Sequence, residues 1–452
     1  MSERKRRFSR RGFLSKAAAA VAAPYVVPAA VLGQRSSRNG EQTVPPSERV
    51  GVAFLGSGQR GYQWVSYLSR MPQVRCVGVC DVSDRAIELG LRYANRREQG
   101  CKPYKDFREV LDLKDVDAVL IATPDHWHGV LAVQAAKAGK DVFCESPMSL
   151  TVREAQEIAR VAQRYGRVFQ AGTDRRSNAN LATACEIIRG QQLGEIKEVY
   201  VQAGPPSRHC HLSSGESPGS LNWDMWLGPA PEAPYHPYRV SGQSSFTYGW
   251  RAWRDYCGGQ LASHGSHYFD MIHWALGLDE TGPVEVLPGE PRASEHSHQP
   301  VGKNQKVLTV RYANGLTVHN AKGPKGALVE FVGSVGTLGV GLGEKDFQTW
   351  PEEIGLAAMK EAQASGQRRS SSSGRYYAAS NHAADWIDCV RTRKKCVSDA
   401  ETARRSVTVC HLGCIATWLG RAIRWDPVKE EIVGDAEASR WLDRPRRAPW
   451  RV

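Results

Sequence analysis

A glycine-rich segment and a later aspartate have the spacing of a dinucleotide site. Residues 50–55 form an apolar run that leads directly into the motif G-x-G-x-x-G, and a second apolar run, residues 74–80, ends at Asp81. In such a unit the first glycine permits a tight turn, the second lets the backbone approach a diphosphate, and the third brings a helix close to the strand. The motif residues are Gly56, Ser57, Gly58, Gln59, Arg60 and Gly61.

The charges of this unit favour NAD over NADP as the cofactor. The N–H groups at the start of the helix expected over residues 62–70 would bind the phosphates. The carboxylate of Asp81 would accept hydrogen bonds from both ribose hydroxyls and would repel a 2′-phosphate. Arg60 and Arg85 are the residues that would weaken this preference. A glycine motif alone is weak evidence, but strand, helix and acid in the right order predict a nucleotide-binding unit.

Two histidine-rich segments offer possible metal ligands. The first has a polar residue at every third position, which forms one row on a helix: His264, His267, Asp270 and His273. Either this row binds a metal ion, or His267 faces a cleft while the later members make structural hydrogen bonds. The second segment, residues 209–211 (HCH), lies in a loop rich in Pro, Ser and Gly and is expected to be exposed. We therefore predict no metal site.

The elements around the glycine motif alternate between strands and helices. Strands are expected at residues 117–122, 141–145 and 168–170, and helices at 129–138 and 152–164. This rhythm predicts an α/β fold whose N-terminal Rossmann domain, residues 49–170, is a doubly wound parallel sheet.

The pattern changes after residue 170. Strands expected at residues 196–201, 307–312 and 316–319, with hairpins between 323 and 343, indicate a C-terminal α+β domain over residues 171–425 with a large, mostly antiparallel open sheet. Residues 363–374 are expected to form a mobile loop, and residues 426–452 an irregular tail.

The first 33 residues have the features of a twin-arginine signal peptide. Arg10 and Arg11 precede Gly-Phe-Leu, and the uncharged stretch 17–32 is shorter than the roughly 20 apolar residues that a membrane span needs. An uncleaved membrane anchor is the alternative. We expect the twin-arginine translocation machinery to export the folded chain to the periplasm or another extracytoplasmic space. Residues 34–48 would then form a linker.

The overall charge is basic without indicating a nucleic-acid partner. The formal net charge is +13, and about half of this excess lies in the predicted signal. The remaining basic residues are scattered in pairs, and no basic stripe is interleaved with aromatic residues, so nucleic-acid binding is excluded. The 11 cysteines are dispersed rather than spaced as a disulfide framework.

Several segments resemble the Gfo/Idh/MocA family of oxidoreductases, in particular its exported members. Besides the glycine motif, the resemblance rests on residues 122–128 (ATPDHWH), 139–150, 223–231, 258–267, 388–394 and 410–413. It implies hydride exchange between a nicotinamide ring and a sugar or cyclitol carbon, in a homodimer or homotetramer. It also assigns cofactor contacts: Glu145 near the nicotinamide ribose, and the nicotinamide end lined by Thr123, Pro124, Asp125 and His128.

The chain departs from the family at two positions that handle protons. The family's Glu-Lys-Pro is Glu-Ser-Pro here, so Ser146 replaces the lysine that assists removal of the substrate's hydroxyl proton. The family's Asp-x-Gly-x-His keeps its histidine as His267, but its aspartate is replaced by Ser263. A serine hydroxyl has no charge and is a weak acid and base at neutral pH.

These departures leave three functions open. In the first, which we predict, the chain is an NAD-dependent oxidoreductase with His267 as general base, assisted by His264 or Tyr268. In the second, tightly held NAD oxidises a glycoside transiently and so enables elimination, as in some glycoside-hydrolysing members of the family. In the third, the chain is a non-catalytic, NAD-loaded carbohydrate-binding protein.

The resemblance also suggests a substrate contact. The family often places a Trp-Arg pair near the cofactor or substrate, and Trp250 and Arg251 form such a pair. We expect the indole to stack on a sugar ring and the guanidinium to donate to sugar oxygens. Simple packing of the tryptophans is the alternative.

Overall fold

The computed structural model describes residues 37–38, 41–42, 44–241, 246, 249–289, 307–343, 345–364 and 381–452. The chain divides into two units, residues 1–49 and 50–452. In the first, a short antiparallel pair, β1 (Ser37–Arg38) and β2 (Glu41–Gln42), precedes the 3-10 helix η1 (Pro46–Glu48). The predicted signal at residues 1–33 lies outside the described residues. Within the described ranges, no helix has both the length and the apolar character of a membrane span.

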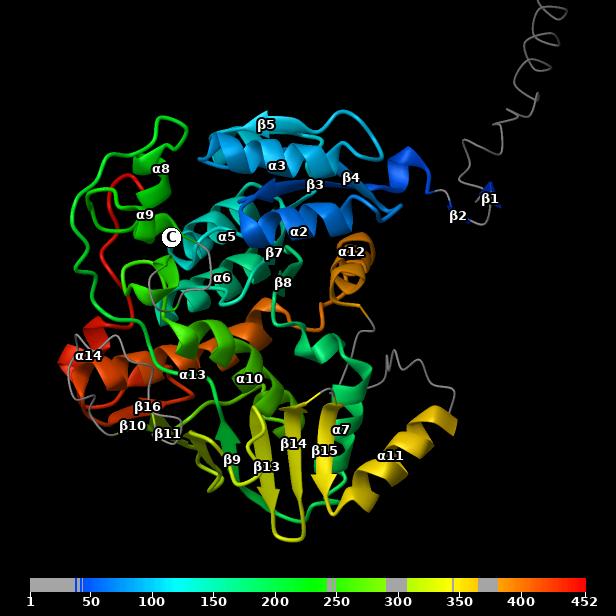
Figure 1. The fold of residues 1–452 in the computed structure, drawn as a ribbon, viewed down its shortest axis with the longest axis vertical. Helices are drawn as coiled ribbons and strands as arrows, with labels where there is room; N and C mark the ends of the chain where they lie inside the picture. Colours follow the sequence, from blue (N-terminus) through cyan, green and yellow to red (C-terminus); the bar gives the residue numbers. More distant parts are fainter. Residues whose placement is uncertain are drawn as a thin grey trace, which may run out of the picture. The chain divides into compact units, whose positions relative to one another are not determined.

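The second unit begins with a six-stranded parallel sheet (Figure 1). Its strand order is β5-β4-β3-β6-β7-β8, so the direction of winding reverses between β3 and β6. Ligands of such sheets bind beyond the carboxyl ends of the strands at this reversal. The strands are β3 (Val50–Leu55), β4 (Val74–Cys80), β5 (Lys102–Tyr104), β6 (Ala118–Ile121), β7 (Asp141–Cys144) and β8 (Phe169–Ala171).

Helices bury both faces of this sheet. Side chains alternate along a strand, so Val52 and Phe54 pack in one apolar cluster while Ala53 and Leu55 pack in another on the opposite face. This confirms the predicted doubly wound Rossmann fold. The helices are α2 (Gln59–Leu68), α3 (Asp84–Ala94), α4 (Phe107–Leu111), α5 (His128–Lys137) and α6 (Val152–Arg164), with the 3-10 turn η2 (Asp125–Trp127).

The C-terminal part is built on a nine-stranded sheet of order β15-β14-β13-β9-β12-β11-β10-β16-β17. β9 and β12 run parallel, and the other neighbouring pairs are antiparallel, which confirms the predicted class of sheet. The strands are β9 (Ile196–Val201), β10 (Glu285–Pro288), β11 (Leu308–Arg311), β12 (Thr317–Asn320), β13 (Val329–Gly333), β14 (Thr337–Leu342), β15 (Lys345–Trp350), β16 (Ile423–Asp426) and β17 (Glu431–Ile432).

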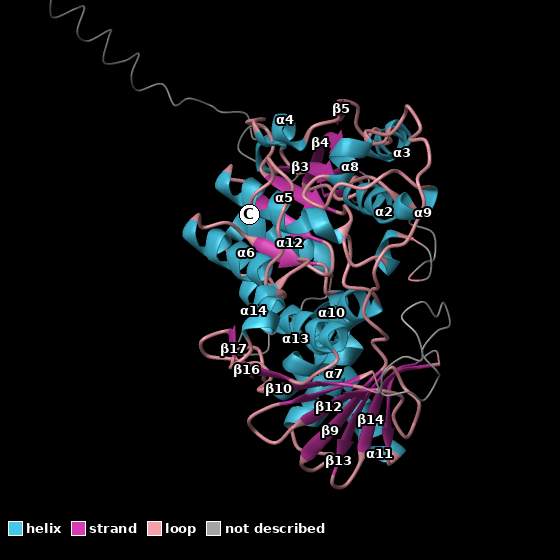
Figure 2. Ribbon diagram, turned by 90° about the vertical axis from the view of Figure 1, so that its left-hand side faces the viewer, coloured by secondary structure: helices cyan, strands magenta, loops and turns pink. Residues whose placement is uncertain are grey.

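Two long helices, α10 (Gln260–Leu276) and α13 (Ala400–Leu419), lie between the two sheets (Figures 1 and 2). Together with α7 (Ala179–Arg189) they cover one face of the nine-stranded sheet and share its core. The remaining elements are η3 (Asp174–Ser177), α8 (Trp223–Leu227), α9 (Pro237–Val240), η4 (Trp250–Ala252), α11 (Glu352–Ala364), α12 (His382–Thr392) and α14 (Ala436–Arg440).

The C-terminal residues differ from the expected irregular tail. β17 and α14 lie within residues 426–452, and Trp450 is buried in the core of the first sheet, where its ring centroid lies 4.8 Å from that of Trp127. Helix α12, predicted as part of the second domain, also packs on the first sheet through Trp386. Local sequence patterns do not reveal such long-range contacts. Of the predicted loop at 363–374, residues 363–364 end α11 and the rest lies outside the described residues.

Candidate functional site

The turn between β3 and α2 has the geometry that its glycines predict. Gly56 has a φ of +90°, and a Cβ there would lie 2.8 Å from the backbone of Ala122. A Cβ on Gly61 would lie 2.1 Å from the carbonyl oxygen of Gly56, so helix and turn are in close contact. A Cβ on Gly58, in contrast, would meet no described atom within 4 Å. The space beside Gly58 at the N-terminus of α2 is therefore open to a phosphate.

Asp81, at the end of β4, is held by this turn. Its carboxylate accepts hydrogen bonds from the N–H groups of Ser57 (2.7 Å) and Ser83 (3.0 Å). Burial raises the pKa of Asp81, and these N–H groups oppose the shift. The Ser57 hydroxyl is used as well, since it donates to the carbonyl of Ala86 (2.8 Å). A fixed carboxylate beside an open glycine turn fits the adenosine half of NAD.

At the end of β6, beside the strand-order reversal, the structure places buried polar groups. In the described part of the chain, Thr123 Oγ1 and Asp125 Oδ2 are buried without a hydrogen-bond partner. Burial raises the pKa of Asp125 to about 6, and the charges of His128 and Arg251 oppose the shift. Unpaired buried polar atoms are costly, so this pair fits a ligand group at the predicted nicotinamide end. Pro124, between these two residues, is the N-cap of η2.

His128 is a structural link rather than an exposed side chain. It is 1% exposed, its Nδ1 lies 2.7 Å from the carbonyl of Pro147, and its Nε2 lies 2.9 Å from the carbonyl of Thr123. Burial lowers the pKa of His128, but Cys144, Asp125 and the Pro147 carbonyl raise it to about 10. Two carbonyl acceptors require both ring N–H groups, so a charged imidazolium joins the loops after β6 and β7.

Glu145, at the end of β7, connects that loop to helix α2. Its Oε1 accepts from Arg60 Nε (2.6 Å) and Trp64 Nε1 (2.5 Å), and its Oε2 accepts from the N–H of Ser146 (3.0 Å). The Arg60 charge, which was expected to weaken the preference for NAD, is therefore paired with a carboxylate. The approach of Glu145 to a nicotinamide ribose stays a prediction.

Helix α10 brings the predicted proton-handling residues together. His267 Nε2 lies 2.7 Å from Ser146 Oγ, so the replaced lysine position and the retained histidine are in direct contact. His264 lies one turn earlier, at the surface; partial desolvation lowers its pKa, and the charges of His267, Arg251 and Arg175 add to this. Tyr268 is buried, with the Arg175 guanidinium 5.7 Å from its ring.

The later members of the histidine row make structural contacts, as one of the two interpretations expected. Asp270 accepts from Arg176 Nε (2.8 Å), and His273 Nε2 lies 2.9 Å from the hydroxyl of Tyr312.

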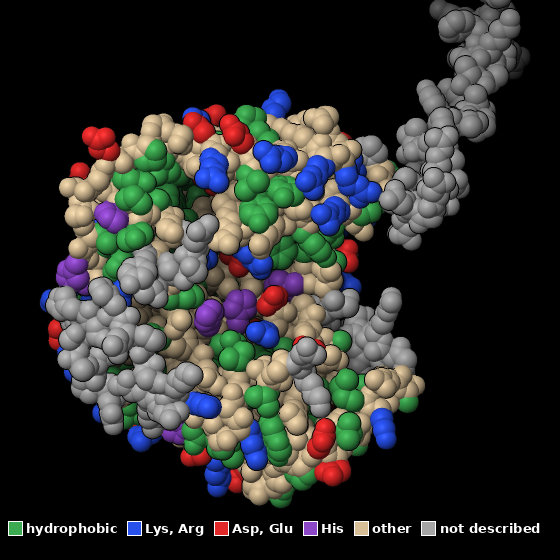
Figure 3. All heavy atoms as spheres, viewed as in Figure 1, with side chains coloured by type: hydrophobic (Ala, Val, Ile, Leu, Met, Phe, Trp, Pro, Cys, Tyr) green, Lys and Arg blue, Asp and Glu red, His purple; other side chains and the backbone are tan. Residues whose placement is uncertain are grey.

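The predicted substrate pair lies on η4: Trp250 is buried, and the Arg251 guanidinium stacks 4.2 Å from its ring. Near the middle of the face drawn in Figure 3, histidine side chains lie next to acidic and basic ones.

Sequence reasoning missed one residue of this group, Asp174. It begins η3, directly after β8, and its Oδ1 lies 3.4 Å from His267 Nδ1. Its position in the sequence could have identified it, because a polar residue just beyond the carboxyl end of a parallel strand lies where ligands bind.

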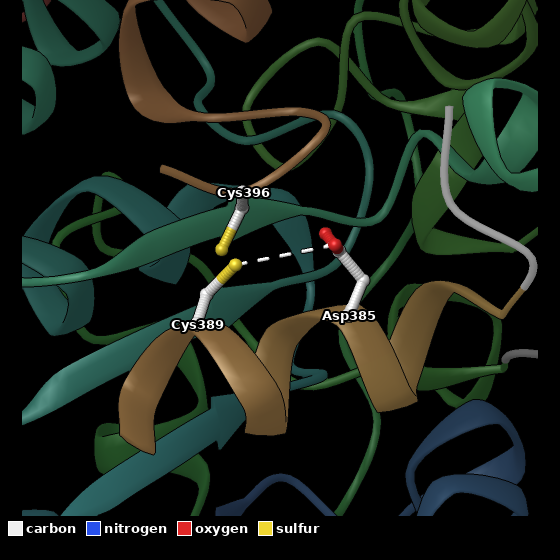
Figure 4. Close-up of side chains that lie close together, drawn as sticks. All are labelled: Asp385, Cys389 and Cys396. Carbon is white, nitrogen blue, oxygen red and sulfur yellow. Dashed lines mark hydrogen bonds between the residues drawn. The ribbon is translucent and has the colours of Figure 1, made fainter. Parts of the chain in front are cut away.

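A cluster outside this site could be mistaken for a metal centre. In the described ranges, one group of three residues has the required spacing: Asp385, Cys389 and Cys396 (Figure 4). The carboxylate already accepts from the N–H of Val397 (3.0 Å) and from the Cys389 thiol (3.9 Å). Burial raises the pKa of the Cys396 thiol well above its usual range. The cluster is a hydrogen-bonded connection between α12 and the following loop.

The parallel sheet, the open glycine turn and the fixed Asp81 define an NAD-binding Rossmann domain. Two family descriptions match the chain: "Oxidoreductase family, NAD-binding Rossmann fold" over residues 50–173, and "Oxidoreductase family, C-terminal alpha/beta domain" over residues 207–334 and 373–452. The chain belongs to the Gfo/Idh/MocA family of oxidoreductases and is an enzyme. This finding argues against the third interpretation, a non-catalytic carbohydrate-binding protein.

Curated relatives match a shorter stretch. "Glycosyl hydrolase family 109 protein 1" of Shewanella sp. (strain ANA-3) and "Alpha-N-acetylgalactosaminidase" of Shewanella oneidensis are each 34% identical over 171 residues. The match covers 34% of this chain and 37% of each relative. The chain thus spans little more than a third of the length of these relatives.

Solved structures share the fold over most of the chain. Levoglucosan dehydrogenase in complex with NADH and levoglucosan (17% identity, TM-score 0.54) and myo-inositol 2-dehydrogenase from Lactobacillus plantarum (18%, 0.54) each cover 83% of this chain and 99% of their own. Aldose-aldose oxidoreductase from Caulobacter crescentus (16%, 0.55) has the same coverage. At this identity the likeness establishes the fold alone.

Proposed function

We propose that this enzyme uses NAD to oxidise a hydroxyl group of a sugar or cyclitol, with Ser146 and His267 together accepting the hydroxyl proton. The observation that carries the proposal is the 2.7 Å contact between Ser146 Oγ and His267 Nε2. Ser146 follows β7, next to the carboxyl edge of the sheet where the cofactor binds. A hydroxyl held against an imidazole nitrogen is a working proton path, which a serine alone would not provide.

The chain's own residues have separable tasks in this proposal. The N–H groups at the start of α2 hold the diphosphate, and Asp81 accepts from the ribose. When bound, NAD supplies the acceptor for the hydride that leaves the substrate carbon. As the substrate hydroxyl loses its proton to Ser146 Oγ, the serine proton passes to His267 Nε2, so one proton leaves the substrate and one arrives at the imidazole. The positive charge then forms on His267 instead of being present beforehand on a lysine.

The curated relatives favour a second function, in which oxidation is transient. Oxidising a sugar carbon would acidify the neighbouring C–H group, so that a base could remove this proton as the glycosidic oxygen leaves. Water would then add to the resulting double bond, and bound NAD would supply both the initial oxidation and the final reduction. The names of the relatives, a glycosyl hydrolase family 109 protein and an alpha-N-acetylgalactosaminidase, suggest this course. An enzyme that retains NAD through each cycle would also suit export, because no NAD supply is needed outside the cytoplasm.

We also propose, from the sequence, that the twin-arginine machinery exports the chain to an extracytoplasmic space and that it works as a homodimer or homotetramer. The basis for export is the paired Arg10 and Arg11 ahead of a short uncharged stretch. Cell fractionation of wild type and an Arg10→Lys, Arg11→Lys variant tests the route. Export of the variant at the wild-type level would contradict it.

The proposed chemistry is tested on the purified, NAD-loaded protein. Reduction of the bound coenzyme by free sugars or inositols, seen in its near-ultraviolet absorbance, supports the dehydrogenase. Release of the aglycone from aryl glycosides without net reduction supports the second function. The decisive variant is Ser146→Lys with Ser263→Asp, which restores the family's residues. If the wild type converts no substrate while this variant does, the native chain is not a conventional dehydrogenase.

A further inference from the structure

The second ring nitrogen of His267 faces a carboxylate that the family pattern does not supply. In the described structure His267 Nδ1 is buried and makes no well-aligned hydrogen bond, yet Oδ1 of Asp174 lies only 3.4 Å away. This distance exceeds that of a usual N–H···O bond. Catalytic hydrogen bonds are often long without substrate and shorten in the reacting complex. Ser146, His267 and Asp174 therefore lie in sequence, with the imidazole between a hydroxyl and a carboxylate.

The surroundings of Asp174 keep its carboxylate ionised. The Asp174 side chain is 52% exposed, and its partial desolvation raises the pKa, but the close approach and charge of His267, with the charges of His382 and Arg175, lower the pKa to about 2. The carboxylate is thus ionised at any pH at which the enzyme would work. Polar groups from several elements surround the His267 ring or its carboxylate partner: Ser146 after β7, Asp174 and Arg175 on η3, His264 and Asp270 on α10, and His382 on α12.

The short element that holds Asp174 is firmly anchored to α10. Arg176, two residues later, is 3% exposed and donates to Asp270 of α10 (2.8 Å) and to Asp279 (2.7 Å). On the other side, Ser177 Oγ lies 2.8 Å from His382 Nδ1. These buried contacts fix η3 relative to the helix that carries His267, so the approach of the carboxylate to the ring is set by the fold.

The position of the lost family aspartate explains why another carboxylate is needed. Ser263 lies four residues before His267, one turn away on the same face of α10. Its hydroxyl lies 3.5 Å from the Cys257 sulfur and carries no charge. An imidazole without a carboxylate neighbour can hold its proton on either nitrogen, and only one tautomer presents a free electron pair to Ser146.

We propose that Asp174 is a positioning residue that keeps the neutral His267 ring protonated on Nδ1, which replaces the carboxylate lost at position 263. The inference rests on the proposed function for its catalytic consequence. With the proton on Nδ1, Nε2 accepts the proton that arrives through Ser146, and the Asp174 carboxylate then stabilises the imidazolium. This is the division of tasks in a Ser–His–Asp triad, where the carboxylate orients the ring without taking its proton.

The tautomer is measurable without knowing the substrate. Nitrogen-15 NMR of histidine-labelled, NAD-loaded protein distinguishes the two tautomers, and His267→Gln assigns the signal. We expect the Nδ1–H form in wild type and in the control Asp112→Asn, which changes an exposed aspartate at the end of α4. Asp174→Asn should give a mixed or reversed tautomer, and Asp174→Glu should restore the wild-type form in part. Bound NAD content and circular dichroism show whether each variant folds.

The catalytic consequence is measured on whichever substrate reduces bound NAD. Asp174→Asn should lower kcat roughly 10- to 1000-fold with little change in KM, and should move the acid-side midpoint of the rate profile to lower pH. Adding Ser263→Asp to Asp174→Asn should restore part of the rate. A folded Asp174→Asn variant with the wild-type tautomer and rate profile would overturn the proposal. A changed tautomer in a protein that converts no sugar would refute the proposed function and leave the inference about Asp174 standing.

Discussion

Replacing Gly58 with alanine separates the fold from cofactor binding at a single position. Gly58 has φ −62° and ψ −162°, which lies at the edge of the extended region that alanine adopts. The added methyl group would meet no described atom within 4 Å. A glycine-to-alanine change at a compatible position stabilises a protein by about 0.4–1 kcal/mol, because the unfolded chain loses freedom. Cofactor-free Gly58→Ala should therefore unfold at the same temperature as wild type or slightly above it.

NAD binding should respond in the opposite direction. The methyl group would occupy the open space at the N-terminus of α2, where the diphosphate is expected to contact main-chain N–H groups. We expect the Kd for NAD to rise at least about tenfold, which corresponds to about 1.4 kcal/mol. Isothermal calorimetry on cofactor-free protein measures this, and the NAD content of freshly purified protein gives an independent reading.

Gly61→Ala is the matched control for this position. Its Cβ would lie 2.1 Å from the Gly56 carbonyl oxygen, a backbone atom that cannot rotate away. Forcing a methyl group into such a contact costs about 1–3 kcal/mol or more, so this variant should lose thermal stability even without cofactor. If Gly58→Ala folds normally and binds NAD as tightly as wild type, the diphosphate does not lie against this glycine and the assignment of the cofactor site is wrong.

Two further predictions concern stability. The folded-state pKa of His128 is raised from 6.5 to about 10, so its stabilising effect is complete below pH 6.5 and is lost as the pH rises towards 10. Each pKa unit corresponds to about 1.4 kcal/mol. In urea unfolding, the free energy of unfolding of wild type should therefore fall more between pH 7 and 10 than that of His128→Gln. An equal fall in both proteins would disprove the charged state of His128. Arg176→Met would leave the carboxylates of Asp270 and Asp279 without their buried cation. We expect it to lower the free energy of unfolding by about 3–5 kcal/mol, and a loss below about 1 kcal/mol would show that the network is dispensable.

The sequence predicted most accurately those helices and strands whose own residues carry the whole pattern, without help from distant contacts. The expected strands at residues 50–55, 74–80 and 196–201, and the helix at 152–164, have the observed bounds. Each is an apolar run, an alternating segment or an amphipathic helix bounded by turn residues. The short strands β5 and β10 were not predicted, because two to four residues paired in a sheet carry too little periodicity to be distinguished from loops.

The site was only partly predictable for a related reason. Sequence spacing gave the glycine turn and Asp81, because one continuous βαβ unit contains them. The contact of Ser146 with His267 joins residues 121 positions apart, and Asp174 comes from a third element. The resemblance to a family named the first two residues. It did not indicate Asp174, because that residue belongs to none of the motifs on which the resemblance rests.

In the proposed mechanism, the combination of a neutral Ser146 with the His267–Asp174 pair would change how charge is balanced during the reaction. A lysine at position 146 would place a permanent cation beside the reacting oxygen and stabilise an alkoxide before any proton had moved. With serine, the cation exists only after His267 has accepted the proton, and Asp174 stabilises it at that moment. In this mechanism proton transfer and loss of hydride would be closely coupled, since Ser146 offers no positive charge to an alkoxide formed early. For the same reason, restoring the lysine alone would place a second cation next to the imidazole and disfavour its protonation, so Ser263→Asp has to accompany it.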